Sequence, residues 1–243
     1  MGRRKIVLIT GASRGIGRAL ALAFGRHEYA VIVNYLREKE KAVLVVDEIA
    51  RSGGCARSVR ADVGDPVQVQ RMIETIAAQE GRIDVLVNNA GVARDGGILR
   101  ITPQEWNIVL QTNLTGAFFV MQQCARMMVK QKEGAIINIA SIAGLRGAPG
   151  AANYASAKAG ISALTKSAAK ELGRFNVRVN AVMPGFHLTD MGQSVPGAYV
   201  RRAKEDSVLG CTTAGDEMAA FIVFLAGMRT VSGQIFNWDS RII

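Results

Sequence analysis

The sequence predicts an α/β protein built on a doubly wound parallel sheet of about seven strands, with helices on both faces. Short runs rich in Val and Ile alternate along the chain with longer segments that have helical periodicity. A glycine-rich turn joins the first run to the first helical segment. Polar motifs directly follow several runs, at the edge where such a sheet binds its ligands. No internal repeat or linker divides residues 1–243, so we expect a single domain.

The composition is that of a protein with one large core. The chain has 243 residues, of which 49% are hydrophobic, and it has no apolar run of about 18 residues that could span a membrane. Its cysteines, Cys55, Cys124 and Cys211, are odd in number and scattered, which predicts neither disulfides nor a zinc site. His27 and His187 lack a second ligand at useful spacing. We therefore expect a cytoplasmic protein without a metal.

The charge is strongly basic. Thirty basic and twenty acidic residues give a net charge of +10, which favours an anionic ligand or partner. A solvated basic surface is the alternative. The sequence has no long basic tail, zinc finger or aromatic-basic RNA motif, so we expect no nucleic-acid partner.

The first strand, Lys5–Thr10, runs directly into the turn Gly11–Gly17, and a helix is predicted from there to about His27. In this arrangement the glycines let the backbone approach a pyrophosphate, and the helix N-terminus attracts its charge. The spacing is GxxxGxG and not the GxGxxG of the dinucleotide fingerprint. We interpret the unit as the phosphate cradle of a Rossmann-type sheet. A glycine turn without a ligand is the alternative.

The second strand, Tyr29–Asn34, bears on the choice of cofactor. An acidic residue at its end would hold the ribose 2′-hydroxyl of NAD. Here the position carries Asn34, with Arg37 just beyond it and Arg14 in the glycine turn. Two guanidinium groups suit a 2′-phosphate, so we predict NADP(H) as the cofactor. The alternative is that both arginines only lie on the surface.

Two further strand–helix units follow. A helix around 41–52 stops at Gly53 and Gly54, and a strand near 56–60 leads into Asp62 and Val63. Asp65 then caps a helix that reaches about residue 79, with proline at its first position. The next strand, 83–87, ends at the run Asn88-Asn89-Ala90-Gly91.

A capping box at Thr102 and Glu105 predicts a long helix that continues through Asn113, an asparagine among apolar residues that must find partners. Ser141 follows the strand 134–139. The strand 177–182 leads to Pro184-Gly185, with Thr189 beyond. Residues 186–214 are predicted to form a flap that controls access to the site.

Tyr154 and Lys158 stand four residues apart in a predicted helix, so their side chains share one face about 5–6 Å apart at Cβ. An ammonium group held there favours the phenolate. Lowering the tyrosine pKa by about three units would need about 4 kcal/mol, which a neighbouring charge in a semi-buried site can supply. The pair is a candidate acid and base, although the same spacing is common on helix surfaces.

These motifs together resemble those of the short-chain dehydrogenase/reductase family over nearly the full length. Within that family the chain is similar to the reductases that act on 3-oxoacyl groups of an acyl carrier protein. The motifs that carry the resemblance are Thr10–Gly17, Asp62-Val63, Asn88–Gly91, Asn113, Ser141, Tyr154 through Lys158 and Pro184-Gly185.

The resemblance implies a role for each member of a catalytic tetrad. Tyr154 would protonate the substrate carbonyl oxygen as hydride arrives at its carbon, and Ser141 would hydrogen-bond that oxygen. Lys158 would hold the nicotinamide ribose and lower the tyrosine pKa, and Asn113 would position a water that feeds protons to the lysine. The residues expected at the cofactor are Gly11, Ser13, Arg14, Gly15, Ile16, Gly17, Asn34, Arg37, Asp62, Val63, Asn89, Ala90, Gly91, Tyr154, Lys158, Pro184, Gly185 and Thr189.

The resemblance also implies partners. Relatives dock an acidic acyl carrier protein on basic residues beside the active-site mouth, and the matching positions are Lys132 and Arg174. A homotetramer or homodimer is expected. The chain departs from the family pattern at 207–217, where Leu209, Gly210 and Glu217 are kept, and at 237–240, two segments that help build the tetramer interface in relatives.

The expected activity is NADPH-dependent reduction of 3-oxoacyl thioesters in fatty-acid or related biosynthesis. One alternative is the same chemistry on a polyketide, quinone or steroid carbonyl. Another is a catalytically silent regulator that binds NADPH without turnover.

Overall fold

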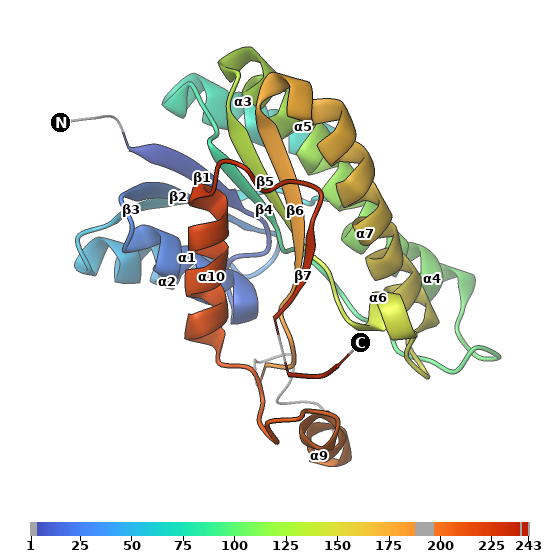
Figure 1. Cartoon of the computed structure of the whole chain (residues 1–243). Helices are drawn as coiled ribbons and strands as arrows, with labels where there is room; N and C mark the ends of the chain where they lie inside the picture. The colour runs from blue at the N-terminus through green and yellow to red at the C-terminus, as the bar shows by residue number, and fades with distance from the viewer. Residues whose placement is uncertain (1–3, 188–196, 239, 243) are drawn as a thin grey trace.

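The computed structural model describes residues 4–187, 197–238 and 240–242, and its centre is a seven-stranded sheet (Figure 1). All strands are parallel and lie in the order β3-β2-β1-β4-β5-β6-β7. Successive strands are added outward from β1 on one side and from β4 on the other, so the topological switch point lies between β1 and β4. The predicted fold class is confirmed. The strands are β1 (Lys5–Ile9), β2 (Tyr29–Tyr35), β3 (Cys55–Arg60), β4 (Val85–Asn88), β5 (Gly134–Ile139), β6 (Val177–Met183) and β7 (Ile235–Asn237).

Helices cover both faces of the sheet. One layer contains α1 (Gly15–Gly25), α2 (Lys39–Arg51) and α10 (Gly215–Gly227), and the other contains α3 (Pro66–Glu80), α5 (Ala117–Gln131) and α7 (Ala152–Leu172). The remaining helices lie toward the carboxyl ends of the strands, except for the short turn Gly173–Phe175 after α7. They are α4 (Pro103–Leu110), α6 (Ala143–Arg146) and α9 (Gly197–Glu205).

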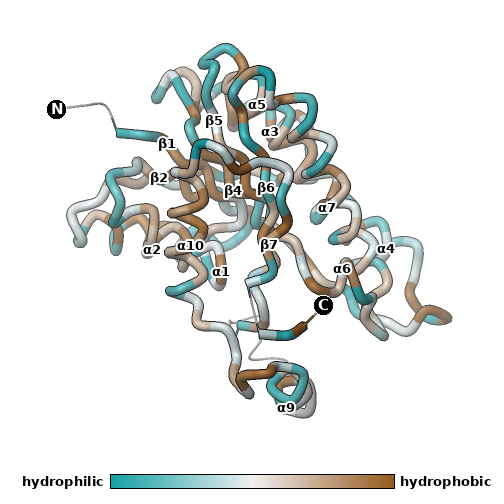
Figure 2. The backbone as a smooth tube through the Cα atoms, viewed as in Figure 1, coloured by the Kyte–Doolittle hydropathy of each residue, from teal (hydrophilic) through white to brown (hydrophobic). Residues whose placement is uncertain are grey.

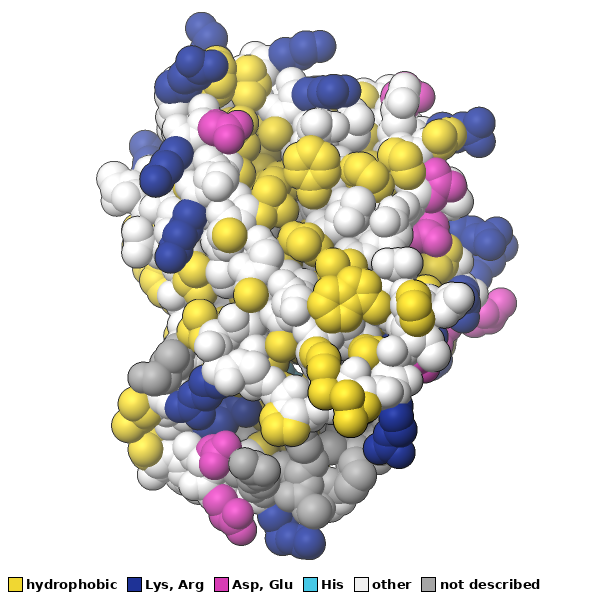
Figure 3. Space-filling view, turned by 90° about the vertical axis from the view of Figure 1, so that its right-hand side faces the viewer, with side chains coloured by type: hydrophobic (Ala, Val, Ile, Leu, Met, Phe, Trp, Pro, Cys, Tyr) yellow, Lys and Arg dark blue, Asp and Glu magenta, His cyan; other side chains and the backbone are white. Residues whose placement is uncertain are grey.

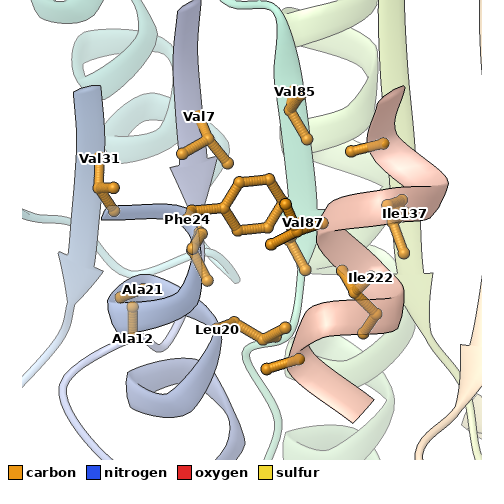
Figure 4. Packing of buried hydrophobic residues seen from close by; sticks show 14 of the residues in the cluster. Val7, Ala12, Leu20, Ala21, Phe24, Val31, Val85, Val87, Ile137 and Ile222 are labelled. Atoms are coloured by element: carbon orange, nitrogen blue, oxygen red, sulfur yellow. The ribbon is translucent and has the colours of Figure 1, made fainter. Parts of the chain in front are cut away.

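The core explains why the strand sequences are almost continuously apolar. Parallel strands between two helical layers are buried on both faces, so neither face of the strand is left for water. Figure 4 shows Phe24 of α1 reaching toward Val7, Val85 and Val87 on the sheet, beside Ile222 of α10. A strand of this kind gives no alternation of apolar and polar residues from which side-chain direction could be predicted.

The predicted helix from Thr102 differs from the structure at one place. Thr102 forms the expected capping box with Glu105, but α4 ends at Leu110 and a π-helical turn, Gln111–Gly116, separates it from α5. Such turns insert one extra residue and often mark functional sites. Asn113 lies in this turn.

The two segments that depart from the family pattern meet each other. Ser207 and Arg241 form an antiparallel bridge, and the Val208 N–H donates to the Ser240 carbonyl at 3.1 Å. Within the described residues, no helix has the length and hydrophobicity needed to cross a membrane.

Candidate active site

At the carboxyl ends of β1 and β4, hydrogen bonds join the glycine turn to the Asn88–Gly91 run. The side-chain Nδ2 of Asn89 donates to the carbonyls of Thr10 and Gly11, at 2.9 and 3.1 Å. The Thr10 hydroxyl accepts from the N–H groups of Asn89 and Ala90, both at 3.0 Å. Two motifs that are far apart in sequence are therefore one hydrogen-bonded unit.

Gly17 is required by the close packing of this unit. A Cβ at Gly17 would lie 2.4 Å from the Gly11 carbonyl oxygen and 2.5 Å from Asn89 Nδ2, closer than any side chain allows. The first turn of α1 has neither a side-chain cap nor an acidic residue. Its N–H groups and positive dipole end are thus available to an anionic group, and the cradle fits a dinucleotide pyrophosphate.

A cavity of about 570 Å³ opens beside the start of α1. Ser13, Arg14 and Gly15 line one side, and His187, Thr212 and Thr213, from the two ends of the predicted flap, line another. The remaining lining residues are Arg18, Ala19, Lys41, Leu44 and Gly215. The part of the flap between its ends, 188–196 with Thr189, lies outside the described residues.

Two of the three cations of this cavity share one carboxylate, and the third, Arg18, pairs with Glu48 at 2.6 Å. Arg14 Nη1 lies 3.8 Å from one oxygen of Glu38, and Lys41 Nζ lies 2.9 Å from the other. The hydrogen bond from Lys41 lowers the pKa of Glu38. Arg37 is exposed on the loop after β2. Lys41 is a basic residue that the sequence analysis did not select, although its place at the start of the helix after the second strand was a usable signal.

The structure corrects the assignment of Asn34 to the cofactor ribose. Asn34 is 1% exposed, and its Oδ1 accepts from the Gly11 N–H at 3.2 Å. Its Nδ2 donates to the carbonyls of Val59 and Ala61, at 3.4 and 3.1 Å. The side chain is turned into the sheet and fastens the glycine turn to β3. An aspartate here would face two carbonyl oxygens, so it would disturb folding and not cofactor choice.

Tyr154 and Lys158 lie in the first two turns of α7, on one face as predicted. The lysine Nζ is 5.7 Å from the centre of the tyrosine ring and donates to the Ile139 carbonyl at 2.5 Å, at the end of β5. Lys158 is only 5% exposed, and this burial lowers its pKa to about 8. The pair thus combines a phenol with an ammonium group that can lose its proton near neutral pH.

Ser141 follows β5 by two residues and lies next to the start of α6. Its Oγ accepts from the Ala143 N–H at 3.2 Å, and the hydroxyl keeps its proton to donate. Gly144 allows α6 to lie directly on α7, because a Cβ there would be 2.7 Å from the backbone of Lys158 and Ala159. The serine loop is in this way held against the helix that carries the lysine.

Asn113 uses both ends of its side-chain amide on one residue. It is 1% exposed, its Oδ1 accepts from the Val92 N–H at 2.8 Å, and its Nδ2 donates to the Val92 carbonyl at 2.9 Å. The side chain therefore fixes the loop after β4. A role in holding water at Lys158 stays a prediction.

The other expected cofactor residues lie at the same edge of the sheet. One carboxylate oxygen of Asp62 accepts a hydrogen bond from the Gly64 N–H at 2.9 Å, and Val63 is buried. Pro184 and Gly185 directly follow β6, and the Pro184 carbonyl contacts the His187 ring at 2.5 Å. Ile16, Ala90 and Gly91 belong to the hydrogen-bonded unit or its neighbouring turns.

The predicted carrier-docking residues lie away from the active-site residues of their own chain, so docking there stays a prediction. Lys132 precedes β5 and Arg174 follows α7, so both lie at the amino edge of the sheet (Figure 1). The Lys132 carbonyl accepts from Asn176 at 3.1 Å, which joins these two loops. Tyr154 lies near the other end of α7, a helix of 21 residues that is about 30 Å long. The direction of parallel strands separates the two positions from the site.

The comparisons with known proteins decide the family. A profile of the short chain dehydrogenase family matches residues 5–199. This chain belongs to the short-chain dehydrogenases. It is 42% identical over 239 residues to the 3-oxoacyl-(acyl-carrier-protein) reductase FabG of Staphylococcus aureus, with 98% of this chain and 97% of that protein covered.

Two other relatives of this short-chain dehydrogenase carry the same description. The Synechocystis reductase is 43% identical over 242 residues, and the Thermotoga maritima FabG is 39% identical over 241 residues. Each comparison covers 98% of this chain, with 97% and 98% of the relatives. Among solved structures, a variant of actinorhodin polyketide ketoreductase with NADPH is similar at a TM-score of 0.92 and 30% identity, with 98% and 96% of the two chains covered.

Proposed function

We propose that this short-chain dehydrogenase reduces the ketone of 3-oxoacyl thioesters carried on an acyl carrier protein, with NADPH as the hydride donor. The observation that carries the proposal is the Tyr154–Lys158 pair, which stands at the same sheet edge as the glycine turn. Relatives about 40% identical over the whole chain that bear this activity in their names support the choice of substrate.

The cofactor supplies hydride, and the side chains handle charge and proton at the substrate oxygen. The Tyr154 hydroxyl donates a proton to that oxygen, while the Ser141 hydroxyl donates a hydrogen bond to it. The Lys158 ammonium stabilises the phenolate that remains, and its depressed pKa lets it return a proton. Asn113 holds the loop after β4 beside these groups.

NADP(H) is proposed over NAD(H) because cations line the cavity beside the glycine turn. Arg14, Lys41 and Arg18 offer charge-assisted hydrogen bonds to a 2′-phosphate. Arg37, exposed on the loop after β2, stays a proposed contributor. A bound phosphate would take the place of the Glu38 carboxylate as the partner of Arg14 and Lys41.

The test is the rate of cofactor oxidation with a set of substrates. We expect NADPH to be consumed with a 3-oxoacyl carrier-protein thioester, more slowly with the same acyl group on a small thiol, and NADH to be poorly used. A protein that binds NADPH but consumes it with none of these would be a regulator. One that prefers a polyketide, quinone or steroid ketone would support the alternative substrates, of which a polyketide has the added support of the similar ketoreductase structure.

We further propose that the carrier approaches the carboxyl edge of the sheet. The loop before α4 ends in a hydrophobic tip (Figure 2), where Leu99 is 96% exposed. This loop is attached beside the site, since the Gly96 N–H donates to the Gly150 carbonyl at 2.8 Å. On this loop and on the neighbouring segment 143–147, the exposed basic and apolar residues are Arg94, Arg100, Arg146, Ile98, Leu99 and Leu145, and the exposed acidic residue is Asp95.

Charge reversal at the two edges separates the docking sites. The pair Arg100→Glu and Arg146→Glu should lower kcat/KM for the carrier-linked substrate about tenfold at low salt, by lost steering, and spare the small thioester. The pair Lys132→Glu and Arg174→Glu makes the same charge change at the amino edge and is expected to leave both substrates unaffected. If instead only the Lys132→Glu and Arg174→Glu pair lowers kcat/KM for the carrier-linked substrate, the carrier docks at Lys132 and Arg174 and delivers its acyl group to the active site of another subunit.

A homotetramer or homodimer is proposed on the basis of two apolar faces. On one, Phe221 stacks on Trp238 at 4.4 Å between ring centres, beside exposed Phe224 and the edge strand β7. Figure 3 looks onto another, the side with α4, α6 and α7, where hydrophobic side chains gather along the middle and Lys and Arg lie mostly around the margin. The mass from sedimentation velocity decides the state. A cytoplasmic location is proposed with this function.

A further inference from the structure

A buried asparagine stands directly before Tyr154 in the first turn of α7. Asn153 is 0% exposed, and its Oδ1 accepts from the Tyr154 backbone N–H at 2.8 Å. Its Nδ2 donates to the Arg94 carbonyl at 3.0 Å and, with poorer geometry, to the Glu105 carbonyl at 3.5 Å. One side chain thus joins α7, the loop after β4, and α4, which lie side by side in Figure 1.

The start of α7 needs such a side chain. The first N–H groups of any helix have no partner within the helix. Ala151, which precedes α7, has no side chain that could cap it, and the first turn contains no acidic residue. Tyr154 carries one of these N–H groups, and the Asn153 Oδ1 satisfies it. The hydrogen bond therefore fixes the backbone of the residue that bears the reacting phenol.

The loop that Asn153 holds is also held by Asn113. Asn113 binds the N–H and the carbonyl of Val92, and Asn153 binds the carbonyl of Arg94, two residues later. Both ends of the segment Val92–Arg94 are therefore fixed by buried amides. This segment sets the position of the first turn of α7 relative to the π-helical turn.

We propose that Asn153 is a positioning residue that aligns Tyr154 with the rest of the tetrad. The inference rests on the proposed role of Tyr154 as the proton donor. Only an amide serves this position fully, because it offers donors to the two carbonyls and an acceptor to the N–H. Aspartate keeps the acceptor alone, and alanine keeps neither.

The test compares Asn153→Ala with a matched variant, Asn180→Ala. Asn180 in β6 is also buried, and it donates to the Val231 carbonyl at 2.9 Å and accepts from the Gln234 N–H at 3.0 Å. Both variants lose the same kinds of bond and should lower Tm. Only Asn153→Ala should lower kcat, by about 10–100-fold as expected for a reacting group displaced by about 1 Å, with the Kd for NADPH unchanged.

A second measurement needs no substrate. The titration of Tyr154, followed by tyrosinate absorbance with Tyr154→Phe as the blank, should move in Asn153→Ala and not in Asn180→Ala. The inference would be overturned if Asn153→Ala and Asn180→Ala lost the same amount of kcat when compared at equal folded fractions. It would also be overturned if the titration of Tyr154 did not change in Asn153→Ala. A wild type inactive on 3-oxoacyl substrates would instead count against the proposed function. If Asn153→Ala does not fold, Asn153→Asp is compared with Asn180→Asp, and a smaller loss of kcat is expected in Asn153→Asp alone, because aspartate keeps the acceptor for the Tyr154 N–H and loses the bond to the Arg94 carbonyl.

Discussion

Replacing Tyr154 by Phe is expected to lower kcat by about 10²–10⁴-fold and to leave NADPH binding intact. The substitution keeps the ring and removes only the hydroxyl that we propose as the proton donor. The ring lies 5.7 Å from Lys158 Nζ, on a helix fixed at its start by Asn153, so neither packing nor the cofactor cradle should change. Single-turnover rates with NADPH measure the chemical step, and fluorescence titration measures cofactor affinity.

The control for this prediction is Tyr29→Phe, which removes a phenol at the opposite edge of the sheet. Tyr29 begins β2, at the amino edge of the sheet and away from the site, and burial raises its pKa above the ordinary value. Near-normal turnover of Tyr154→Phe would reject the assignment of the acid. A loss of NADPH affinity as large as the loss of kcat would mean that the tyrosine serves binding.

Replacing Lys158 by Met is expected to reduce kcat/KM by about 10²–10⁴-fold and to remove a break in its pH profile. In the wild type, kcat/KM should be level below about pH 8 and fall above it, because burial lowers the Lys158 pKa to about 8 and the ammonium is then lost. Methionine is nearly as long as lysine and fills the same buried space without a charge. A wild-type profile level to pH 9 would contradict this role for the lysine.

Stability should depend on pH through the same group. The pKa of Lys158 is lower in the folded protein than the ordinary value of about 10.4 in the unfolded chain, so between about pH 8 and 10 the unfolded state binds more protons. The free energy of unfolding of the wild type, measured relative to Lys158→Met, should therefore rise across this window. Urea melts at several pH values measure it, and a difference that falls with pH would contradict the burial of a charged lysine.

Much of the fold could be predicted because its signals are local. Each strand is a short apolar run, and the glycine turn, the capping box at Thr102 and the cap at Asp65 depend on neighbours within a few residues. The spacing of Tyr154 and Lys158 also placed them correctly, because helix geometry alone puts residues four apart on one face. The edge at which the motifs meet followed from the parallel direction of the strands.

The errors arose where a side chain's direction depends on distant segments. Strands buried on both faces do not alternate polar and apolar residues, so nothing in the neighbouring sequence indicates that Asn34 points into the sheet toward Val59 and Ala61. Lys132 and Arg174, which were assigned by resemblance and stay a prediction, lie at the edge of the sheet opposite the site of their own chain. Asn153 was passed over because an asparagine before a tyrosine has no distinctive pattern.

The sequence alone determined that this chain is a parallel α/β protein with a glycine turn between its first strand and helix and a tyrosine–lysine pair, because those features are set by short-range spacing. The tertiary structure decided which polar groups bind one another around those features. The π-helical turn presents Asn113 to Val92, Asn89 reaches the glycine turn across 78 residues, and burial depresses the pKa of Lys158. These are contacts between residues far apart in sequence, and the partner of a buried polar group is fixed only when the whole core has closed around it.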